Sequence, residues 1–329
     1  MRLTFFCPSS SKPVGGIKVI YRLAELCDQL LGDQGEASVL HPNRPWVQYG
    51  WFDARPNHRR LFFRPQWVGK PSFSDIGNAF SAERDVVVLP EIWVRKYGVQ
   101  LAQKKIPFAI LVQGGYLMAK GLKSNLDTAF AAAKLIWSVS ENASACVQQA
   151  FPFAGHKIRP LQLHVDANKF TPASEKENLI SYMPRKLPAH IDLWKFFTAA
   201  HLPNSWKLQA IDGQDEAGVA RLLGKSKIFL SMSYLEGLGL PPLEAALAGN
   251  LVLGYTGEGG KGYWKAPLFH EIAHGDLLAL SQKTIELLRH TDDLNSMTYV
   301  SARQQLASLF SADAQQKSVE QFLGELMSQ

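Results

Sequence analysis

From residue 231 the chain reads Ser231-Met-Ser-Tyr-Leu-Glu236-Gly-Leu-Gly-Leu-Pro-Pro-Leu-Glu244-Ala-Ala-Leu-Ala-Gly249. Two carboxylates stand on either side of a glycine loop that runs into a predicted helix. The two prolines suit the first turn of that helix, where a missing N–H costs nothing, and Gly249 suits a left-handed C-cap. We therefore expect Glu244 in the first helical turn and Glu236 just outside the helix.

The glycines predict what the loop binds. Gly237 and Gly239 are expected to leave the backbone uncovered, so that its N–H groups and the positive end of the helix can approach a diphosphate. An ionised carboxylate accepts several hydrogen bonds from hydroxyl groups. Glu236 and Glu244 then suit hydroxyl-rich groups on either side of the phosphates, and the whole stretch suits a sugar nucleotide. The alternative is that Glu244 only complements the helix dipole.

Composition indicates an enzyme-sized chain of two domains. The 329 residues are 46% hydrophobic and 19% charged, enough to bury an ample core. The sequence contains no apolar run as long as a membrane span and no secretory signal, which predicts a cytoplasmic protein. Cys7, Cys27 and Cys146 are far apart in the sequence and lack ligand spacing, which predicts buried thiols. The net charge of +6 weakly favours an acidic partner surface.

Short apolar runs alternate with helical patterns, which predicts mostly parallel sheets covered by helices on both faces. The predicted strands are Leu3–Cys7, Ala37–His41, Asp85–Leu89, Phe108–Gln113, Leu135–Val139, Leu179–Met183, Lys207–Ile211, Lys227–Met232 and Asn250–Tyr255. The predicted helices lie near Ile17–Leu31, Val94–Lys104, Glu141–Phe151, Ile191–Ala200 and Glu216–Leu223, with the helix of the opening stretch after them. The fold class is α/β, with two successive Rossmann-like domains and a linker near residues 157–173.

The pattern S-x-x-E-G-x-G-L-P-P-L-E-A-x-x-A-G resembles the donor-site signature of retaining glycosyltransferases of the GT-B fold, family 4-like, of the bacterial polysaccharide and lipopolysaccharide type. The resemblance implies two Rossmann-like domains that face a central cleft. The N-terminal, acceptor-side domain would span residues 1–170 and the nucleotide-sugar domain residues 171–311. The last helix, residues 312–329, would pack back on the first domain.

Two more segments carry the resemblance. Gly15-Gly16 follows the first predicted strand and resembles the glycine loop that faces the donor diphosphate; a plain turn before a helix is the alternative. Arg185 stands where related enzymes place an arginine that neutralises the phosphates. Their nearby lysine is replaced by His190, which leaves Lys186 as the substitute, and a solvated basic pair is the alternative reading.

The resemblance also implies where the acceptor and the chemistry lie. Many relatives carry a histidine where this chain has Gln113, and an amide can bind a sugar hydroxyl but cannot act as a base. The leaving phosphate would then help to deprotonate the acceptor. The alternative role of Gln113 is that of a buried amide that holds a loop. Glu91, which ends a predicted strand, and Tyr116 are expected on the acceptor side, with a helix cap as the alternative role of Glu91.

Metal ligands and two further segments complete the sequence predictions. We find no Asp-x-Asp pair near a strand end and no histidine cluster, so no metal or other cofactor is expected. Residues 255–263, which are rich in glycine, are expected to border the donor pocket. Residues 44–70 mix aromatic side chains with arginines, which suits a sugar, a lipid headgroup layer or nucleic acid, or else two ordinary strands.

These observations predict a retaining, metal-independent glycosyltransferase that moves a sugar from a nucleoside diphosphate to an acceptor hydroxyl. The acceptor would be a glycan or lipid-linked glycan, reached in the cytoplasm or at the inner face of the membrane; nucleic acid is not favoured. The alternatives are a sugar-nucleotide epimerase or hydrolase of the same fold, and a non-catalytic protein that binds glycan or nucleic acid. The predicted catalytic residues are Glu236 and Gln113. The predicted donor-binding residues are Gly15, Gly16, Arg185, Lys186, Gly237, Leu238, Gly239, Leu240 and Glu244.

Overall fold

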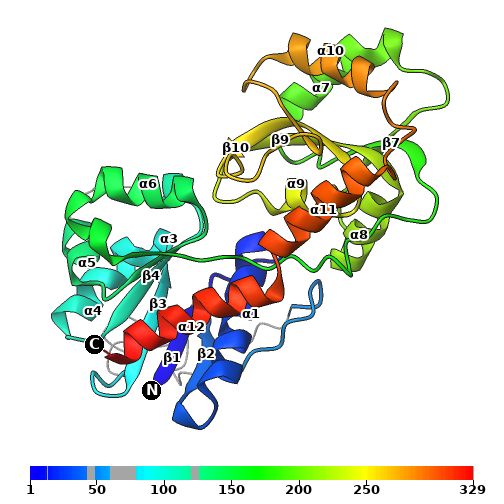
Figure 1. Cartoon of the computed structure of the whole chain (residues 1–329). Coiled ribbons are helices and arrows are strands. Elements are labelled where there is room, and N and C mark those ends of the chain that lie inside the picture. The colour runs from blue at the N-terminus through cyan, green and yellow to red at the C-terminus, as the bar shows by residue number, and fades with distance from the viewer. Residues whose placement is uncertain (13, 43–48, 60–78, 120–125, 329) are drawn as a thin grey trace. The chain divides into compact units, whose positions relative to one another are not determined.

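The computed structural model describes residues 1–12, 14–42, 49–59, 79–119 and 126–328. The chain divides into two compact units, of which unit 1 comprises Met1–Gln162 with Gln315–Gln329 and unit 2 comprises Leu163–Ala314. The border at Gln162 lies within the segment that the sequence suggested as a linker. Each unit is an α/β domain built on one parallel sheet (Figure 1).

The elements of unit 1 follow one another in the order expected of alternating strands and helices. They are β1 (Arg2–Phe6), α1 (Gly15–Leu31), η1 (Gly32–Gln34), β2 (Glu36–Leu40), β3 (Asp85–Pro90), α3 (Glu91–Trp93), the π-helical η3 (Val94–Gly98), α4 (Val99–Gln103), β4 (Phe108–Val112), η4 (Gly115–Ala119), α5 (Leu126–Ala132), β5 (Ile136–Ser138), α6 (Glu141–Ala150), η6 (Pro152–Lys157) and β6 (Ile158–Pro160). The strands form a sheet in the order β2-β1-β3-β4-β5-β6.

Helices cover both faces of this sheet. Successive side chains of a strand point to opposite faces, so neighbouring residues of β5 pack against different helices. On one face, Ile136 joins a core with residues of α4, α5 and α6. On the other, the Trp137 indole stacks on Phe322 of α12 (Ala312–Ser328) with ring centroids 4.0 Å apart. Figure 1 shows α4, α5 and α6 on one side of the strands and α1 with α12 on the other.

The sheet of unit 2 has the order β11-β10-β9-β7-β8. Its elements are β7 (Glu177–Tyr182), α7 (Pro188–Thr198), η7 (Ala199–His201), β8 (Lys207–Ala210), α8 (Glu216–Lys225), β9 (Ser226–Glu236), α9 (Leu240–Leu247), β10 (Leu251–Glu258), β11 (Phe269–Glu271), α10 (Leu277–Leu287) and α11 (Met297–Leu309). Trp194 of α7 and Leu280 of α10 pack into the core on one face of the sheet, and α8, α9 and α11 lie on the other (Figure 1). Residues from Gln315 onward, most of α12, belong to unit 1.

The predicted strands and helices are confirmed, with the differences that follow, and the helix α5 was missed. β6 and β11 were missed, since each has only three residues and no apolar run of its own. β9 is longer than predicted and ends at Glu236. The helix predicted at residues 94–104 is interrupted by the π turn η3, and at its end a Cβ added to Gly98 would lie 2.8 Å from the Cβ of Ala129.

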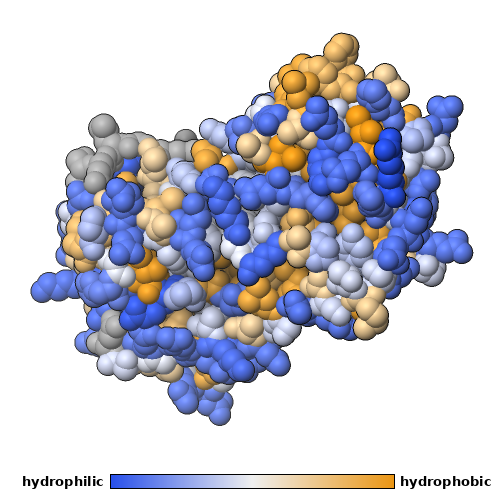
Figure 2. Space-filling model, turned by 45° about the horizontal axis from the view of Figure 1, so that its top comes forward, coloured by the Kyte–Doolittle hydropathy of each residue, from blue (hydrophilic) through white to orange (hydrophobic). Residues whose placement is uncertain are grey.

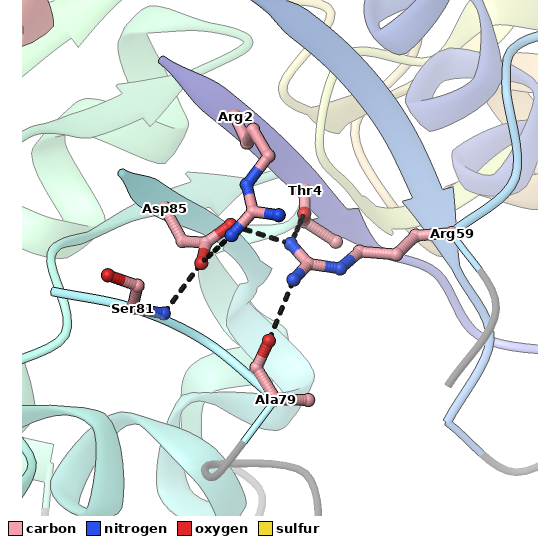
Figure 3. A network of polar contacts seen from close by, with 6 residues as sticks. All are labelled: Arg2, Thr4, Arg59, Ala79, Ser81 and Asp85. Carbon is pink, nitrogen blue, oxygen red and sulfur yellow. Dashed lines mark hydrogen bonds and ion pairs between the residues drawn. The ribbon is translucent and has the colours of Figure 1, made fainter. Parts of the chain in front are cut away.

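An internal salt-bridge network fixes the amino ends of β1 and β3 in unit 1 (Figure 3). The Asp85 carboxylate accepts hydrogen bonds from Arg2 Nη2 at 2.8 Å, from Arg59 Nη1 at 2.8 Å and from the Ser81 backbone N–H at 2.6 Å. Arg59 Nη1 also donates to Thr4 Oγ1 at 3.0 Å. The Asp85 side chain is fully buried, so the two guanidinium groups offset the cost of burying its charge.

Parts of the aromatic and basic segment at residues 44–70 also turn inward. The rings of Tyr49 and Phe52 pack edge to face on Tyr21, with centroids 5.5 and 5.2 Å away. Arg59 is engaged with Asp85. For these residues the structure supports packing within unit 1. Arg44, Trp46, Arg60, Phe62, Phe63, Arg64, Trp67 and Lys70 lie outside the described residues.

Candidate functional site

The strand order of each sheet indicates where a ligand binds. In an open parallel sheet the site lies at the carboxyl ends of the strands, where neighbouring strands send their helices to opposite faces. In unit 2 this position lies between β7, which leads into α7, and β9, which leads into α9. In unit 1 it lies between β1 and β3. The predicted site residues form two groups, one near each of these positions.

In unit 2 the two strand ends are joined by an ion pair. The Lys186 ammonium, which follows β7, contacts the carboxylate of Glu236, the last residue of β9. Both side chains stay partly exposed, at 38% and 25% of their surface. The residues beside them, Leu187 and Leu235, have φ values of 43° and 44°, a region that bulky L residues rarely adopt. Such strain is typical of functional loops.

The glycine loop after Glu236 is buried, contrary to the prediction. Gly237 and Gly239 are covered by the second glycine-rich loop, because a Cβ on Gly259 would overlap the Gly237 carbonyl group. The buried Tyr263 hydroxyl donates to the Gly239 carbonyl at 2.6 Å. The two loops therefore pack against each other. Residues 257–263 contact the signature loop, which we define as residues 237–239, and support it. Leu240, at the start of α9, is half-buried.

The helix α9 begins earlier than its sequence suggested. Gly239 is its N-cap, with φ of 81°, and Leu240 is its first residue. Glu244 therefore lies beyond the first turn, and the prediction that it sits in that turn was wrong. Because the effect of the helix dipole falls off within the first turn, a purely dipolar role for Glu244 loses its support. The predicted cap at the other end is confirmed, since Gly249 has φ of 79°.

The predicted residues of unit 1 meet around the end of β4. Gly16, in the first turn of α1, lies against the Gln113 side chain, since a Cβ added to this glycine would be 3.2 Å from Gln113 Oε1. The backbone N–H of Gln113 donates to Glu91 Oε2 at 3.2 Å. Tyr116 is close in sequence, and its hydroxyl accepts a hydrogen bond from Asn142 Nδ2 at 3.2 Å. The structure thus brings Gly16, Gln113 and Glu91 together, while Gly15 is exposed beside them.

Glu91 is the most perturbed acid of the two groups. Burial raises the pKa of its carboxyl to about 7, and hydrogen bonds from the backbone of Gln113, Glu91 itself and Gly114 act in the opposite direction. Only 5% of the residue is exposed. Glu91 therefore titrates near neutral pH beneath the Gln113 loop.

Sequence reasoning missed one cluster near the Lys186–Glu236 pair. It consists of His190, Tyr234, Tyr255 and His274, which come from α7, β9, β10 and the turn before α10. Four single residues from four segments form no motif in the chain. His190 was noticed only as a departure from the lysine of related enzymes.

Across the described ranges, His, Cys, Asp and Glu side chains do not gather in threes in a way that could hold a metal ion. Among the helices described, none combines the length and the hydropathy that crossing a membrane requires.

No family model matches the chain. The chain is 30% identical over 95 residues to the alpha-1,6-glucosyltransferase of Actinobacillus pleuropneumoniae serotype 7 (strain AP76), a match that spans 27% of this chain and 28% of that relative.

Similar solved structures cover the whole chain. Sucrose-phosphate synthase from Thermosynechococcus elongatus has a TM-score of 0.67 at 14% identity, with 99% of each chain covered. HepE from Anabaena, solved in complex with UDP-glucose, has a TM-score of 0.71 at 13% identity and covers 98% of this chain and 99% of its own. At these identities the likeness establishes the fold. The chain therefore has the GT-B fold of these glycosyltransferases, with a Rossmann-like sheet in each of its two units.

Proposed function

We propose that the protein is a retaining glycosyltransferase that moves a sugar from a nucleoside diphosphate to an acceptor hydroxyl. The observation that carries the proposal is the Lys186–Glu236 pair. It lies at the switch point of the unit 2 sheet, the position between β7 and β9 where the two strands lead into helices on opposite faces. A cation and a carboxylate at this position can meet the two halves of a sugar nucleotide, the phosphates and the sugar hydroxyls.

Each predicted residue has a proposed role. Glu236 accepts hydrogen bonds from the transferred sugar, and the buried Glu244 accepts those of the ribose. Lys186, with Arg185, offsets the charge of the departing diphosphate, helped by the first backbone amides of α9 at Leu240. In unit 1 we assign Gly15 and Gly16 to the diphosphate as well. Gly237, Leu238 and Gly239 are buried, so their role is to hold Glu236 in place.

On the acceptor side we propose Gln113 and Tyr116 as hydrogen-bonding residues, with Glu91 behind them. Neither Gln113 nor Tyr116 is fully buried, so both can reach a ligand. Gln113 cannot take a proton, and the leaving phosphate is the proposed base, as the retaining mechanism allows. We propose that transfer needs no metal ion, with Lys186 and Arg185 as the charge partners of the diphosphate, and we expect it to persist in EDTA.

UDP-glucose is the donor to test first, since HepE was solved with it and the curated relative is named as a glucosyltransferase. The experiment incubates the protein with UDP-glucose, with and without glycan or lipid-linked glycan acceptors, and follows the products and their anomeric configuration by NMR. Glu244→Gln is expected to raise the KM for the donor about tenfold or more, because a hydrogen bond to a charged group contributes about 1.5–3 kcal/mol.

The outcomes separate the alternatives. A product that forms without acceptor would indicate an epimerase or a hydrolase. Binding of glycan without any rise in melting temperature on adding a nucleotide sugar would indicate a non-catalytic binding protein. If UDP-glucose fails, the guanosine, thymidine and adenosine diphosphate sugars are tested in the same way, and failure of all four would contradict the proposal.

We also propose that the reaction takes place at the inner face of a membrane. The solvent side of α7 carries three large apolar side chains, with Leu193 45%, Phe196 76% and Phe197 37% exposed, and Leu278 of α10 is 60% exposed. Figure 2 shows hydrophobic surface gathered over these helices of unit 2. The three cysteines are free thiols, which suits a reducing compartment. Co-sedimentation with lipid vesicles should fall in Phe196→Ser, and unchanged sedimentation would contradict this placement.

A further inference from the structure

Two histidines and two tyrosines form a cluster of rings in unit 2. The ring centroids of His190 and His274 are 5.4 Å apart, and His274 lies 4.8 Å from Tyr255 and 5.1 Å from Tyr234. Tyr255 is buried, whereas Tyr234 is 55% exposed and His274 is exposed. The cluster thus has a buried base and an open side formed by imidazole and phenol rings.

The cluster lies at the same sheet edge as the proposed donor site. Tyr234 precedes Glu236 by two residues on β9, and His190 follows Lys186 by four residues. The contact of Lys186 with Glu236 ties the two segments together. His190 is in the first turn of α7 and His274 directly precedes the Gly275–Asp276 cap of α10, so both imidazoles lie near the positive ends of helices.

Hydrogen bonding fixes the His190 ring. The Tyr255 hydroxyl lies 3.1 Å from His190 Nδ1, and its oxygen already accepts a hydrogen bond from the Gly275 backbone. Burial raises the pKa of the Tyr255 phenol, and the nearby charge of Asp276 adds to the effect, so the hydroxyl keeps its proton. The hydroxyl therefore donates to Nδ1, which leaves the proton of a neutral His190 on Nε2. Nε2–H is then a hydrogen-bond donor.

The neighbouring groups favour an anionic ligand. Two adjacent imidazoles repel each other when both are charged, and an anion placed beside them removes that cost. Asp276, which caps α10, is a charged group that acts on Tyr255, and Lys186 and Glu236 pair with each other at the end of β9. Lys186, four residues before His190, is one of the charges proposed for the diphosphate.

We propose that His190 and His274 bind the diphosphate of the nucleotide sugar and that one of them takes up a proton when it binds. On His190 this proton would go to Nδ1, and the Tyr255 hydroxyl would then turn to accept from it. This inference rests on the proposed function. It adds two phosphate-binding residues from outside the signature loop and makes donor binding dependent on pH. Imidazoles titrate between pH 5 and 8, so affinity should fall as the pH rises through this range.

The test is calorimetric titration of UDP-glucose into the full chain without acceptor, at pH 7.5 in two buffers of different ionisation enthalpy. UDP-glucose is suitable because its diphosphate is a diester and does not itself titrate near this pH. We expect uptake of up to about one proton per UDP-glucose bound. In repeats at higher pH the affinity should fall by up to about tenfold for each pH unit, the change that uptake of one proton predicts. His190→Gln and His274→Gln should each reduce the uptake, and Tyr255→Phe should reduce it less. His201→Gln, which changes an exposed histidine at the end of η7, is the matched control.

The outcomes are distinct. UDP-glucose that binds without proton uptake, or with the same uptake in the double variant His190→Gln/His274→Gln, would overturn the inference and leave the proposed function standing. Absence of binding by UDP-glucose and by the other nucleotide sugars would overturn both. Unchanged circular dichroism and melting temperature of the free variants would show that they are folded.

Discussion

Lys186 and Glu236 form an ion pair between the ends of β7 and β9, the two strands that flank the switch point of the unit 2 sheet. The pair joins residues 50 positions apart in the chain and leaves both side chains partly exposed. Exposed ion pairs contribute little to stability, generally about 0–1 kcal/mol. The protein is therefore expected to fold without this ion pair. Loss of the pair should instead affect ligand binding and catalysis.

Glu236→Gln tests this directly. The amide can still accept one hydrogen bond but carries no charge, so we expect kcat for sugar transfer to fall about 100-fold while the melting temperature changes little. Steady-state kinetics and thermal unfolding provide the two readouts. Glu177→Gln is the matched control, since Glu177 pairs with Lys225 at the amino end of β7 in the same sheet. Equal rates in Glu236→Gln and Glu177→Gln would remove Glu236 from the reaction.

Gly259→Ala tests the packing of the two glycine loops. The added Cβ would overlap the Gly237 carbonyl group, which must shift and carry Glu236 with it. We expect the melting-temperature rise caused by UDP-glucose to be lost or strongly reduced. Gly324→Ala is the control, because nothing lies within 4 Å of a Cβ added there and the helix α12 should gain about 0.5–1 kcal/mol of stability. A normal ligand response in Gly259→Ala would show that the loops move independently.

Glu91 should make the stability of unit 1 depend on pH. Its pKa of about 7 in the folded protein exceeds the ordinary 4.5, so the folded state binds more protons than the unfolded state between these values. The stabilisation is complete below about pH 4.5 and is lost as the pH rises through about 7, a difference of about 3 kcal/mol. Glu91→Gln should remove this dependence.

The measurement is urea unfolding of wild type and Glu91→Gln at pH values from 5 to 8, with the exposed Glu83→Gln as control. The free-energy difference between Glu91→Gln and wild type should grow in favour of the variant as the pH rises. A difference that stays constant across this range would mean that Glu91 does not titrate there.

Asp85→Ala should lower stability without acting on the site. The substitution leaves Arg59 and Arg2 without their buried partner, and breaking a buried ion pair costs about 3–5 kcal/mol. Urea unfolding gives the loss, and Asp33→Ala, an exposed aspartate of the same unit, should be near neutral. Because Asp85 begins β3 at the end opposite Glu91, kcat per folded molecule should be unchanged. A stability loss below about 1 kcal/mol would mean that Arg59 is held by its other contacts.

The sequence predicted the local elements well, because they depend on local patterns. Ser140 is an N-cap whose hydroxyl accepts from the Ala143 backbone at 3.1 Å, and Asp166 forms a turn by accepting from Asn168 at 2.9 Å. Both residue types have short polar side chains that bond nearby backbone groups. The start of α9 was less predictable, since it is fixed by Gly239, whose carbonyl is bound by Tyr263 from another loop.

The sequence by itself determined the alternation of strands and helices, the two parallel sheets and the order of Glu236, the glycine loop and Glu244, because these follow from neighbours along the chain. Only the tertiary structure decided which groups meet: Lys186 with Glu236, Gly259 with Gly237, Glu91 with Gln113, and His190 with His274. The raised pKa of Glu91 belongs to the second class as well. It arises from desolvation, which depends on what packs around a side chain and leaves no local pattern in the sequence.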